Sequence, residues 1–319
     1  MLGAAAGLRN GGWKFRPRSA MLAADLKAED PPVPIVLDRQ RYALPRAGAD
    51  EVEIFAVGDI HGRSDLLEAL LDEAAREPRR AARRVVVLLG DLVDRGADSL
   101  GAIDLALDAA ERARGDETVA LMGNHEAMMR LALDAATPHA DAIDALQTWI
   151  VNGGDKTLVE FVRFSATPAD LDDLLRDARD SLPARVGAWL VSLKSHWRSG
   201  GLLFVHAGVN LGVDLESFLA EPWNAPLATL GGDQHWAWVR RPFLSAAPGP
   251  QGFSGYFVVH GHTPNDLRPD PSAADQIRHF RLNLDSGSVM TGVATMAIFR
   301  GASAEVLTAS GPSDWATGG

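Results

Sequence analysis

Side chains of the kinds that bind metal ions follow five short apolar runs along the chain. Asp59 and His61 come directly after the first run and are two residues apart, so both could reach one ion. Asp91 follows the second run and could bridge two ions, and the residues that could complete the second ion follow the other three runs: Asn124, His206 and His262. Oxygen and nitrogen donors without a thiolate suit Mn²⁺, Fe, Co²⁺ or Zn²⁺ better than soft metals. Two such ions about 3.5–4 Å apart can hold a shared hydroxide and clamp a phosphate group for in-line attack.

The apolar runs are predicted to be strands buried on both faces, because each is short, continuous and β-favouring. They cover residues 52–58, 84–90, 118–123, 201–206 and 255–262. Amphipathic helices are predicted between the first three runs, at 64–77 and 98–114. This spacing is typical of strand–helix–strand units of about 30 residues. Right-handed crossovers would bring the carboxyl ends of these strands to one edge of a sheet, so we expect the polar residues to converge in one crevice.

Several of these residues also have a purely structural interpretation. An aspartate directly after a strand, such as Asp59, often caps a helix, and Asn124 could form a turn. The joint placement of all six residues after strands favours the metal site. His260 would share a strand face with His262 and is expected to pack or to form a hydrogen bond. Asp285 could either cap a turn or support the site.

Composition and charge exclude several other classes of function. The chain has 319 residues, of which 46% are apolar and 23% charged, the balance of a water-soluble globular protein. It has no cysteine, which excludes disulfides, thiolate zinc sites, iron–sulfur clusters and cysteine nucleophiles. Its formal charge of −11 lacks the basic footprint of broad nucleic-acid or anionic-membrane binding. No apolar run approaches the roughly 20 residues that span a bilayer, and we expect a cytoplasmic protein.

Five sequence blocks resemble a known family. In order, GDIHGR (58–63), GDLVDRG (90–96), GNHE (123–126), HAG (206–208) and GHT (261–263) resemble the signatures of the calcineurin-like metallophosphoesterases. Within that superfamily the chain looks like the PPP-type phosphoprotein phosphatases of bacteria and phages. Two weaker blocks, WIVNGGDKTL and LNLDSGSVMTG, are similar to the bacterial members. Many metallophosphoesterases carry a further histidine two residues after the one in the last block, where this chain has Pro264, which argues against the nuclease and general phosphodiesterase branches.

The resemblance implies roles for the residues of these blocks. Asp59 and His61 would hold the first metal ion, Asp91 would bridge both ions, and the second ion would be held by Asn124, His206 and His262. The ions would be Mn²⁺, with Fe, Zn²⁺, Co²⁺ and Ni²⁺ as alternatives.

Further residues are expected to act on the substrate. His125 would be the general acid that protonates the leaving oxygen, oriented and kept charged by Asp94, because a carboxylate partner raises the pKa of an imidazole. Arg95 would grip the phosphate oxygens with its guanidinium fork. Arg240, in a W-x-R pattern, is expected to be a second arginine at the phosphate, and Arg63 a third.

The fold that the resemblance implies is an α/β/β/α sandwich of two mixed β-sheets with a helical cap insertion at about 127–200. The metallophosphoesterase domain would cover residues 49–310. Residues 1–48 would form an N-terminal extension that is partly disordered, and residues 311–319 a C-terminal tail.

The implied activity is hydrolysis of phosphomonoesters by direct attack of a metal-bridging hydroxide. The expected substrates are phosphoserine, phosphothreonine or phosphotyrosine in proteins, or a small phosphoester, and neither a nucleic acid nor a membrane is an expected partner. One alternative is a diadenosine-tetraphosphatase-like hydrolase of dinucleoside polyphosphates. Another is a non-catalytic binding module on the same fold.

Overall fold

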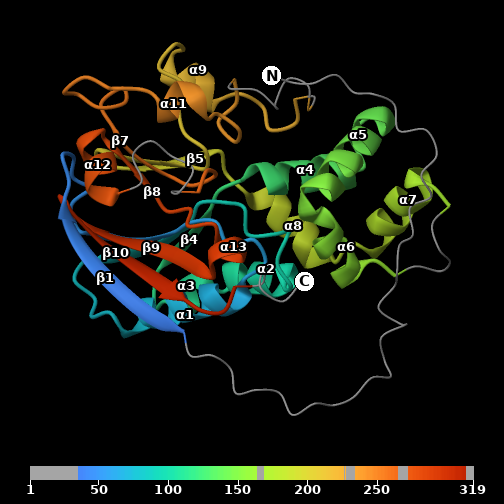
Figure 1. Cartoon of the computed structure of the whole chain (residues 1–319), viewed down its shortest axis with the longest axis horizontal. Coiled ribbons are helices and arrows are strands. Elements are labelled where there is room, and N and C mark those ends of the chain that lie inside the picture. The colour runs from blue at the N-terminus through green and yellow to red at the C-terminus, as the bar shows by residue number, and fades with distance from the viewer. Residues whose placement is uncertain (1–34, 164–168, 226, 228–233, 265–271, 314–319) are drawn as a thin grey trace.

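The computed structural model describes residues 35–163, 169–225, 227, 234–264 and 272–313. In this part of the chain, two β-sheets pack against each other and a group of helices extends to one side (Figure 1). The larger sheet has the strand order β1 (Val36–Ala43), β10 (Ser303–Ser310), β9 (Val293–Arg300), β2 (Val52–Val57), β3 (Arg83–Leu88), β4 (Glu117–Ala120). The smaller has the order β5 (His196–Ser199), β6 (Leu202–Val205), β7 (Phe257–His260), β8 (Arg281–Asn283). Both sheets are mixed, as expected for this fold class.

The predicted strand–helix–strand units form the centre of the larger sheet. Strands β2, β3 and β4 are parallel neighbours, and each crossover is helical: α1 (Ser64–Arg76) in the first, and α2 (Ser99–Leu107) with α3 (Ala109–Arg112) in the second. Helix α1 buries one leucine-rich face against the sheet, through Leu66, Leu67, Leu70, Leu71 and Ala74. The carboxyl ends of the three strands therefore lie at one edge, as the spacing predicts.

The central strands are buried on both faces because each face meets a different apolar layer. Ile54 and Ala56 of β2 belong to the cluster between the sheets, together with Phe204 of β6. Their neighbours Phe55 and Val57 belong to the cluster that contains α1. This arrangement explains why the apolar runs are continuous rather than alternating.

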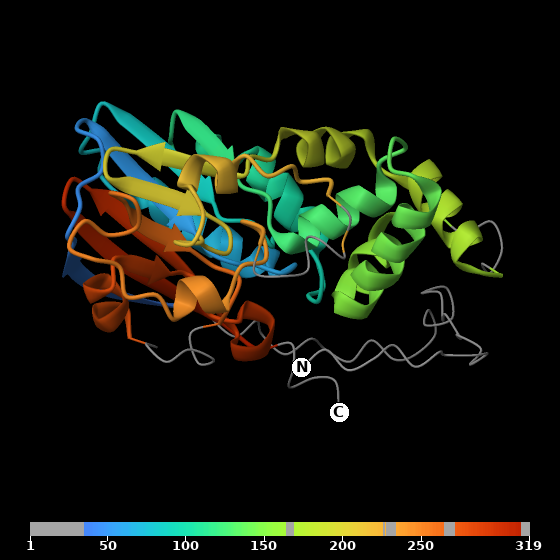
Figure 2. The same ribbon diagram turned by 90° about the horizontal axis from the view of Figure 1, so that it is seen from above.

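A helical insertion separates β4 from β5, as predicted. Its helices are α4 (Asn124–Leu133), α5 (His139–Trp149), the π-helical turn η2 (Ile150–Gly154), α6 (Asp155–Phe161), α7 (Leu171–Ser181) and α8 (Ala184–Ser192). Figure 2 shows these helices beside the sheets rather than over their outer faces. The shorter helices follow later in the chain: α9 (Leu215–Leu219), α11 (Arg241–Leu244), α12 (Ala273–Arg278) and α13 (Ser288–Thr291). None of the helices in the described ranges has the length and apolar character needed to cross a bilayer.

Strand β1 lies within the segment that the sequence assigns to an N-terminal extension. It pairs antiparallel with β10 over all eight of its residues and forms an edge of the larger sheet. Arg39 of β1 forms ion pairs with Glu73 of α1, with Glu77 directly after that helix, and with Glu305 of β10. Residues 36–43 are thus part of the sheet rather than of an extension. Residues 1–34 of the expected extension lie outside the described part of the chain. Polar residues dominate β1, so apolar patterning does not reveal it.

A buried cation fixes the edge of the larger sheet that lies opposite the carboxyl ends of its parallel strands. Arg84 is the second residue of β3, is 1% exposed, and donates from Nε to Oε1 of Glu53 on β2 at 2.8 Å. Its remaining guanidinium hydrogens bind the carbonyl oxygens of Ala74, Ala113 and Glu77, each at 3.0 Å. One side chain therefore joins two strands to the ends of two helices.

We predict that Arg84→Met destabilises the protein by roughly 3 kcal/mol, because the buried carboxylate of Glu53 loses one of its two arginine partners and three carbonyl oxygens lose a charged donor. Arg83→Met is the matched control, since the Arg83 side chain is 50% exposed and forms a surface ion pair with Glu117. Its effect should stay within about 0.5 kcal/mol. Denaturant unfolding of both variants measures the difference, and equal losses would contradict the special role of Arg84.

Candidate functional site

The carboxyl ends of strands from both sheets carry a buried cluster of carboxylates and imidazoles. Asp59 follows β2, Asp91 follows β3, and Asn124 begins α4 shortly after β4. His206 directly follows β6, and His262 follows β7. All are less than 9% exposed. The structure therefore brings together side chains that are two hundred positions apart in the sequence.

The carboxylate of Asp91 lies at the centre of this cluster. Its Oδ2 is 3.7 Å from Nε2 of His61, 3.5 Å from Nε2 of His206 and 4.0 Å from Nε2 of His125. Two groups of closely spaced donor atoms result, one with His61 and His125 and the other with His206 and His262, and Asp91 belongs to both. This is the placement that a carboxylate bridging two ions requires.

Asp59 and Asn124 lie at the margins of the two groups. The carboxylate oxygens of Asp59 accept hydrogen bonds from the backbone N–H of His262 at 3.2 and 3.0 Å. The amide oxygen of Asn124 is 3.3 Å from Nε2 of His206. Both side chains therefore add oxygen donors beside the imidazoles.

The local backbone is unusual at the residues that form the cluster. Five non-glycine residues have a positive φ: His61 (48°), Asp91 (51°), Asp94 (76°), Arg95 (69°) and His262 (70°). Such conformations cost of order 1–3 kcal/mol each and persist only where surrounding structure enforces them. A Cβ at Gly261 would lie 2.0 Å from Oδ1 of Asp59, so only glycine allows this close approach.

Hydrogen bonds to carbonyl groups set the orientation of two imidazoles. Nδ1 of His61 is 3.0 Å from the carbonyl oxygen of Val93, and Nδ1 of His206 is 2.9 Å from that of Leu89. A carbonyl oxygen only accepts, so Nδ1 carries a proton in both rings and Nε2 of each ring faces the centre of the cluster. Nε2 of His61 accepts from Arg95 at 2.8 Å, and the charge of Asp91, against the opposing effect of burial, raises the pKa of His206. Metal-binding histidines are oriented in this way in proteins.

The buried polar atoms of this cluster fit a pair of cations. Neither ring nitrogen of His262 has a hydrogen-bond partner within the described structure, although both are buried. Burial and the charges of Asp285 and Asp91 raise the pKa of Asp59 well above its usual range. Burial also lowers the pKa of His61 and of His262 well below the ordinary value, so neither ring supplies the missing positive charge. Unpartnered nitrogens among crowded carboxylates are what divalent ions would satisfy.

His125 and Asp94 form a hydrogen-bonded pair beside the cluster. Nδ1 of His125 is 2.6 Å from Oδ2 of Asp94, and both residues are fully buried. A guanidinium nitrogen of Arg95 lies 2.8 Å from Nε2 of His125. Arginine only donates, so Nε2 accepts and the ring donates from Nδ1 to Asp94. Burial, against the attraction of Asp91, lowers the pKa of His125 to about 4, so the ring is neutral here rather than charged as the sequence suggests.

The three arginines expected at the phosphate have different surroundings. Arg95 extends into the cluster, where its guanidinium binds Nε2 of both His61 and His125 at 2.8 Å. Arg240 is exposed, and its charge contributes to lowering the pKa of His125 and of His262, which places it near both rings. Arg63 is buried and forms an ion pair with Asp65 at 2.7 Å.

Glu126 has a role in the site that sequence patterns do not assign. Glu126 accepts hydrogen bonds from the backbone N–H groups of Asp91, Leu92 and Gly123, and thereby holds the loop that carries Asp91. Burial raises the pKa of Glu126 to about 7. Its position within GNHE is the one feature of the sequence that could have indicated it.

The structure also shows the surroundings of Asp285, whose role the sequence left open, and of His260. Oδ1 of Asp285 accepts from the backbone N–H of Gly287 at 2.8 Å, and its charge also acts on Asp59, so Asp285 both closes a turn and borders the site. His260 is fully buried and packs against the ring of Phe243 with centroids 4.8 Å apart. It is part of the packing, as expected.

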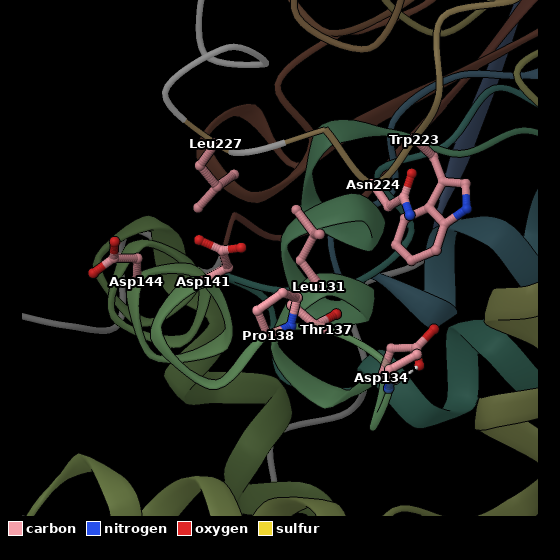
Figure 3. A pocket seen from close by; sticks show the side chains of 10 residues that line it. Leu131, Asp134, Thr137, Pro138, Asp141, Asp144, Trp223, Asn224 and Leu227 are labelled. Atoms are coloured by element: carbon pink, nitrogen blue, oxygen red, sulfur yellow. Dashed lines mark hydrogen bonds between the residues drawn. The ribbon is translucent and has the colours of Figure 1, made fainter.

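A separate cavity of about 200 Å³ lies between α4, α5 and the segment around Trp223 (Figure 3). Three aspartates line it, together with Trp223 and Leu227: Asp134, Asp141 and Asp144. None of the clustered carboxylates and imidazoles borders this cavity.

The sequence matches known proteins over the region that contains the cluster. The model of the calcineurin-like phosphoesterase family matches residues 52–292. Serine/threonine-protein phosphatase 1 of Salmonella typhimurium is 28% identical over 251 residues, which are 76% of this chain and 90% of that protein. A symmetrical bis(5'-nucleosyl)-tetraphosphatase of Acidovorax sp. is 31% identical over 226 residues, 70% of this chain and 62% of that protein. The solved structure of a cold-active protein tyrosine phosphatase aligns with a TM-score of 0.48 at 19% identity, covering 78% of this chain and 76% of that one.

The family match extends over three quarters of the chain and includes every clustered residue from Asp59 to Asp285. The two sheets, the helical insertion and the shared position of Asp91 agree with it. This chain therefore belongs to the calcineurin-like phosphoesterase family, as a metal-dependent phosphoric ester hydrolase with a PPP-type fold and a dinuclear centre for divalent ions.

Proposed function

We propose that this enzyme hydrolyses phosphomonoesters on serine, threonine or tyrosine side chains of proteins, without a phosphoenzyme. The observation that carries the proposal is the Asp91 carboxylate, which is shared by two donor groups with Arg95 and His125 directly beside them. The site thus combines a place for two cations, a cationic fork for phosphate oxygens and an imidazole at hydrogen-bond distance from that fork. In-line displacement at phosphorus needs these groups together.

In this proposal Asp59 and His61 hold one ion, Asp91 bridges, and the second ion is held by Asn124, His206 and His262. The donors are oxygen and imidazole nitrogen, which suits Mn²⁺ or a similar first-row ion. When bound, two such ions polarise the phosphoryl oxygens and lower the pKa of a water molecule so that it can attack phosphorus.

Arg95 would change partners during the reaction. In this structure it donates to Nε2 of His61, but a single lone pair serves only one partner, so His61 must lose Arg95 when it ligates an ion. The released guanidinium is then free to bind two phosphate oxygens, and Arg240 would add a second positive charge from the rim. Arg63, paired with Asp65, would support the loop after Asp59 rather than grip the phosphate itself.

The same exchange would prepare His125 as an acid. While Arg95 donates to Nε2, the ring is neutral and cannot give a proton from that atom. Once phosphate oxygens attract Arg95, Nε2 is free to take a proton from solvent, and Asp94 would stabilise the resulting imidazolium through Nδ1. His125 would then protonate the leaving oxygen of the ester.

Two observations support a protein substrate over a dinucleoside polyphosphate. The Salmonella phosphatase is matched over 90% of its length, whereas the Acidovorax tetraphosphatase is matched over 62%. The cavity at the end of α4 is lined by Asp134, Asp141 and Asp144. At about 1.5 Å per residue, Asp134 lies about 15 Å along the helix from Asn124. A chain of four phosphates that extends from the site toward this cavity would be repelled, whereas a single phosphoester is not affected.

Substrate comparison tests the proposed substrate class. The kcat/KM with manganese should be at least ~10²-fold higher for a phosphopeptide than for a dinucleoside tetraphosphate, since repulsion of about 3 kcal/mol corresponds to that ratio. Replacing Asp141 and Asp144 together by asparagine should raise turnover of the dinucleotide and leave phosphopeptide turnover unchanged. A higher kcat/KM for the dinucleotide in the unmodified enzyme would favour the tetraphosphatase alternative.

The bridging role of Asp91 predicts a loss of bound metal. Asp91→Asn removes the negative charge shared by both donor groups, so stoichiometric binding of two ions should be lost together with turnover. Elemental analysis after saturation with manganese and desalting measures this directly. The exposed Asp108→Asn serves as control and should bind as the unmodified enzyme does. Two retained ions with unchanged turnover in Asp91→Asn would contradict the two-ion site.

The acid role of His125 predicts a dependence on the leaving group. His125→Asn should slow phenyl phosphate by ~10²–10⁴-fold, because its leaving oxygen needs a proton. The slowing should be smaller for p-nitrophenyl phosphate, whose leaving group is stable as an anion. Equal slowing of both substrates would assign His125 another role.

A further inference from the structure

The helical insertion supplies two hydrogen-bond donors to the carboxylate of Asp94. Trp149, the last residue of α5, donates from Nε1 to both oxygens of Asp94, at 2.9 and 2.8 Å. Thr157 of α6 donates from Oγ1 to Oδ1 at 2.6 Å. With Nδ1 of His125 at 2.6 Å from Oδ2, three donors surround this fully buried carboxylate. The insertion therefore reaches the acid pair directly.

Thr157 also braces the backbone of Asp94. The backbone N–H of Asp94 lies 3.1 Å from Oγ1 of Thr157 and 3.0 Å from Oγ of Ser99. Asp94 has a φ of 76°, an unfavourable conformation for a residue other than glycine. The hydroxyl of Thr157 thus fixes both the main chain and the side chain of Asp94.

The turn between these two donors holds the neighbouring residue, Arg95. The backbone N–H of Arg95 donates to the carbonyl oxygen of Gly153 at 3.1 Å, and its Nε donates to that of Asn152 at 3.3 Å. Gly153 has a φ of 106°, and a Cβ there would lie 2.7 Å from Cγ of Arg95. The stretch from Trp149 to Thr157 therefore packs against both members of the Asp94–Arg95 pair.

We propose that Trp149 and Thr157 are positioning residues, through which the helical insertion sets the orientation of His125. Their two donors fix the plane of the Asp94 carboxylate, and Asp94 in turn fixes the rotation of the imidazole about Nδ1. Nε2 is then directed at the place where the leaving oxygen departs. This inference rests on the proposed acid role of His125, and it assigns the insertion a part in proton transfer.

Small errors in orientation have a large effect on such a step. A catalytic group must be held within about 0.5 Å and 10–20° of its productive geometry. A carboxylate with one donor fewer is free to rotate toward the remaining donors, and the imidazole rotates with it. The resulting loss falls on protonation of the leaving group, because neither Trp149 nor Thr157 contacts the metal-binding atoms in this structure.

The chain offers closely matched pairs of variants for a test. Trp149→Phe removes the indole donor, whereas Trp189→Phe in α8 removes the indole N–H of a tryptophan that is also buried and whose Nε1 has no hydrogen-bond partner in the described residues. Thr157→Val removes the hydroxyl, whereas Thr148→Val removes an exposed hydroxyl that binds only the carbonyl oxygen of Asp144. Thr157→Ser restores the hydroxyl and should restore activity.

The readout is the dependence of kcat on the leaving group, with manganese content and thermal unfolding measured in parallel. In Trp149→Phe and Thr157→Val, kcat for phenyl phosphate should fall ~10-fold or more, a part of the full effect of a general acid. The kcat for p-nitrophenyl phosphate should fall less than about 3-fold, KM should stay within about 2-fold, and both ions should remain bound. The two control variants and Thr157→Ser should behave as the unmodified enzyme.

Two results would overturn the inference. One is equal slowing of both substrates, which indicates a structural role alone, and the other is an unchanged kcat for both substrates in both Trp149→Phe and Thr157→Val. Failure of the proposed function itself looks different, because His125→Asn would then show no leaving-group dependence or the unmodified enzyme would hydrolyse neither ester. A normal His125→Asn result with unaffected Trp149 and Thr157 variants would overturn only the role of the insertion.

Discussion

The concentration of buried negative charge around Asp91 is the constraint on which the rest of the site depends. Asp59, Asp91, Glu126 and Asp285 are all nearly inaccessible to solvent, and carboxylates in such surroundings must be paired, protonated or bound to cations. The fold meets this requirement in two ways. Backbone N–H groups bind Glu126, and Asp91 faces the imidazole of His206, whose pKa it raises against the opposing effect of burial. Two divalent ions would balance the rest of this negative charge.

Arg95 connects a proposed metal ligand with the proposed acid, because its guanidinium binds a ring nitrogen of each. It donates to His61, which belongs to the proposed ligand set, and to His125, the proposed acid. The guanidinium thus occupies the two ring nitrogens that a metal ion and the leaving oxygen would need in the proposed reaction. The backbone N–H of Arg95 binds the carbonyl oxygen of Gly153, so the main chain is held independently of the two imidazole contacts.

The helical insertion not only lies beside the crevice but also contributes contacts to the core and to the site. It packs its own apolar residues into the same core as α1, and it also places Trp149 and Thr157 against Asp94. Because such buried polar contacts act together, the sheets and the insertion form one site rather than a site and a lid.

The sequence by itself determined the parallel strands, the helical insertion and the order of the polar residues after the strands, because apolar periodicity and short motifs are local properties. Only the tertiary structure decided the rest. Strand β1 is stabilised by ion pairs and by its ladder with β10, two features that no local apolar pattern encodes. The contacts of Trp149 and Thr157 with Asp94 join positions 55 and 63 residues apart. The neutral state of His125 depends on its complete burial, and burial is set by how the whole chain packs rather than by neighbours in the sequence.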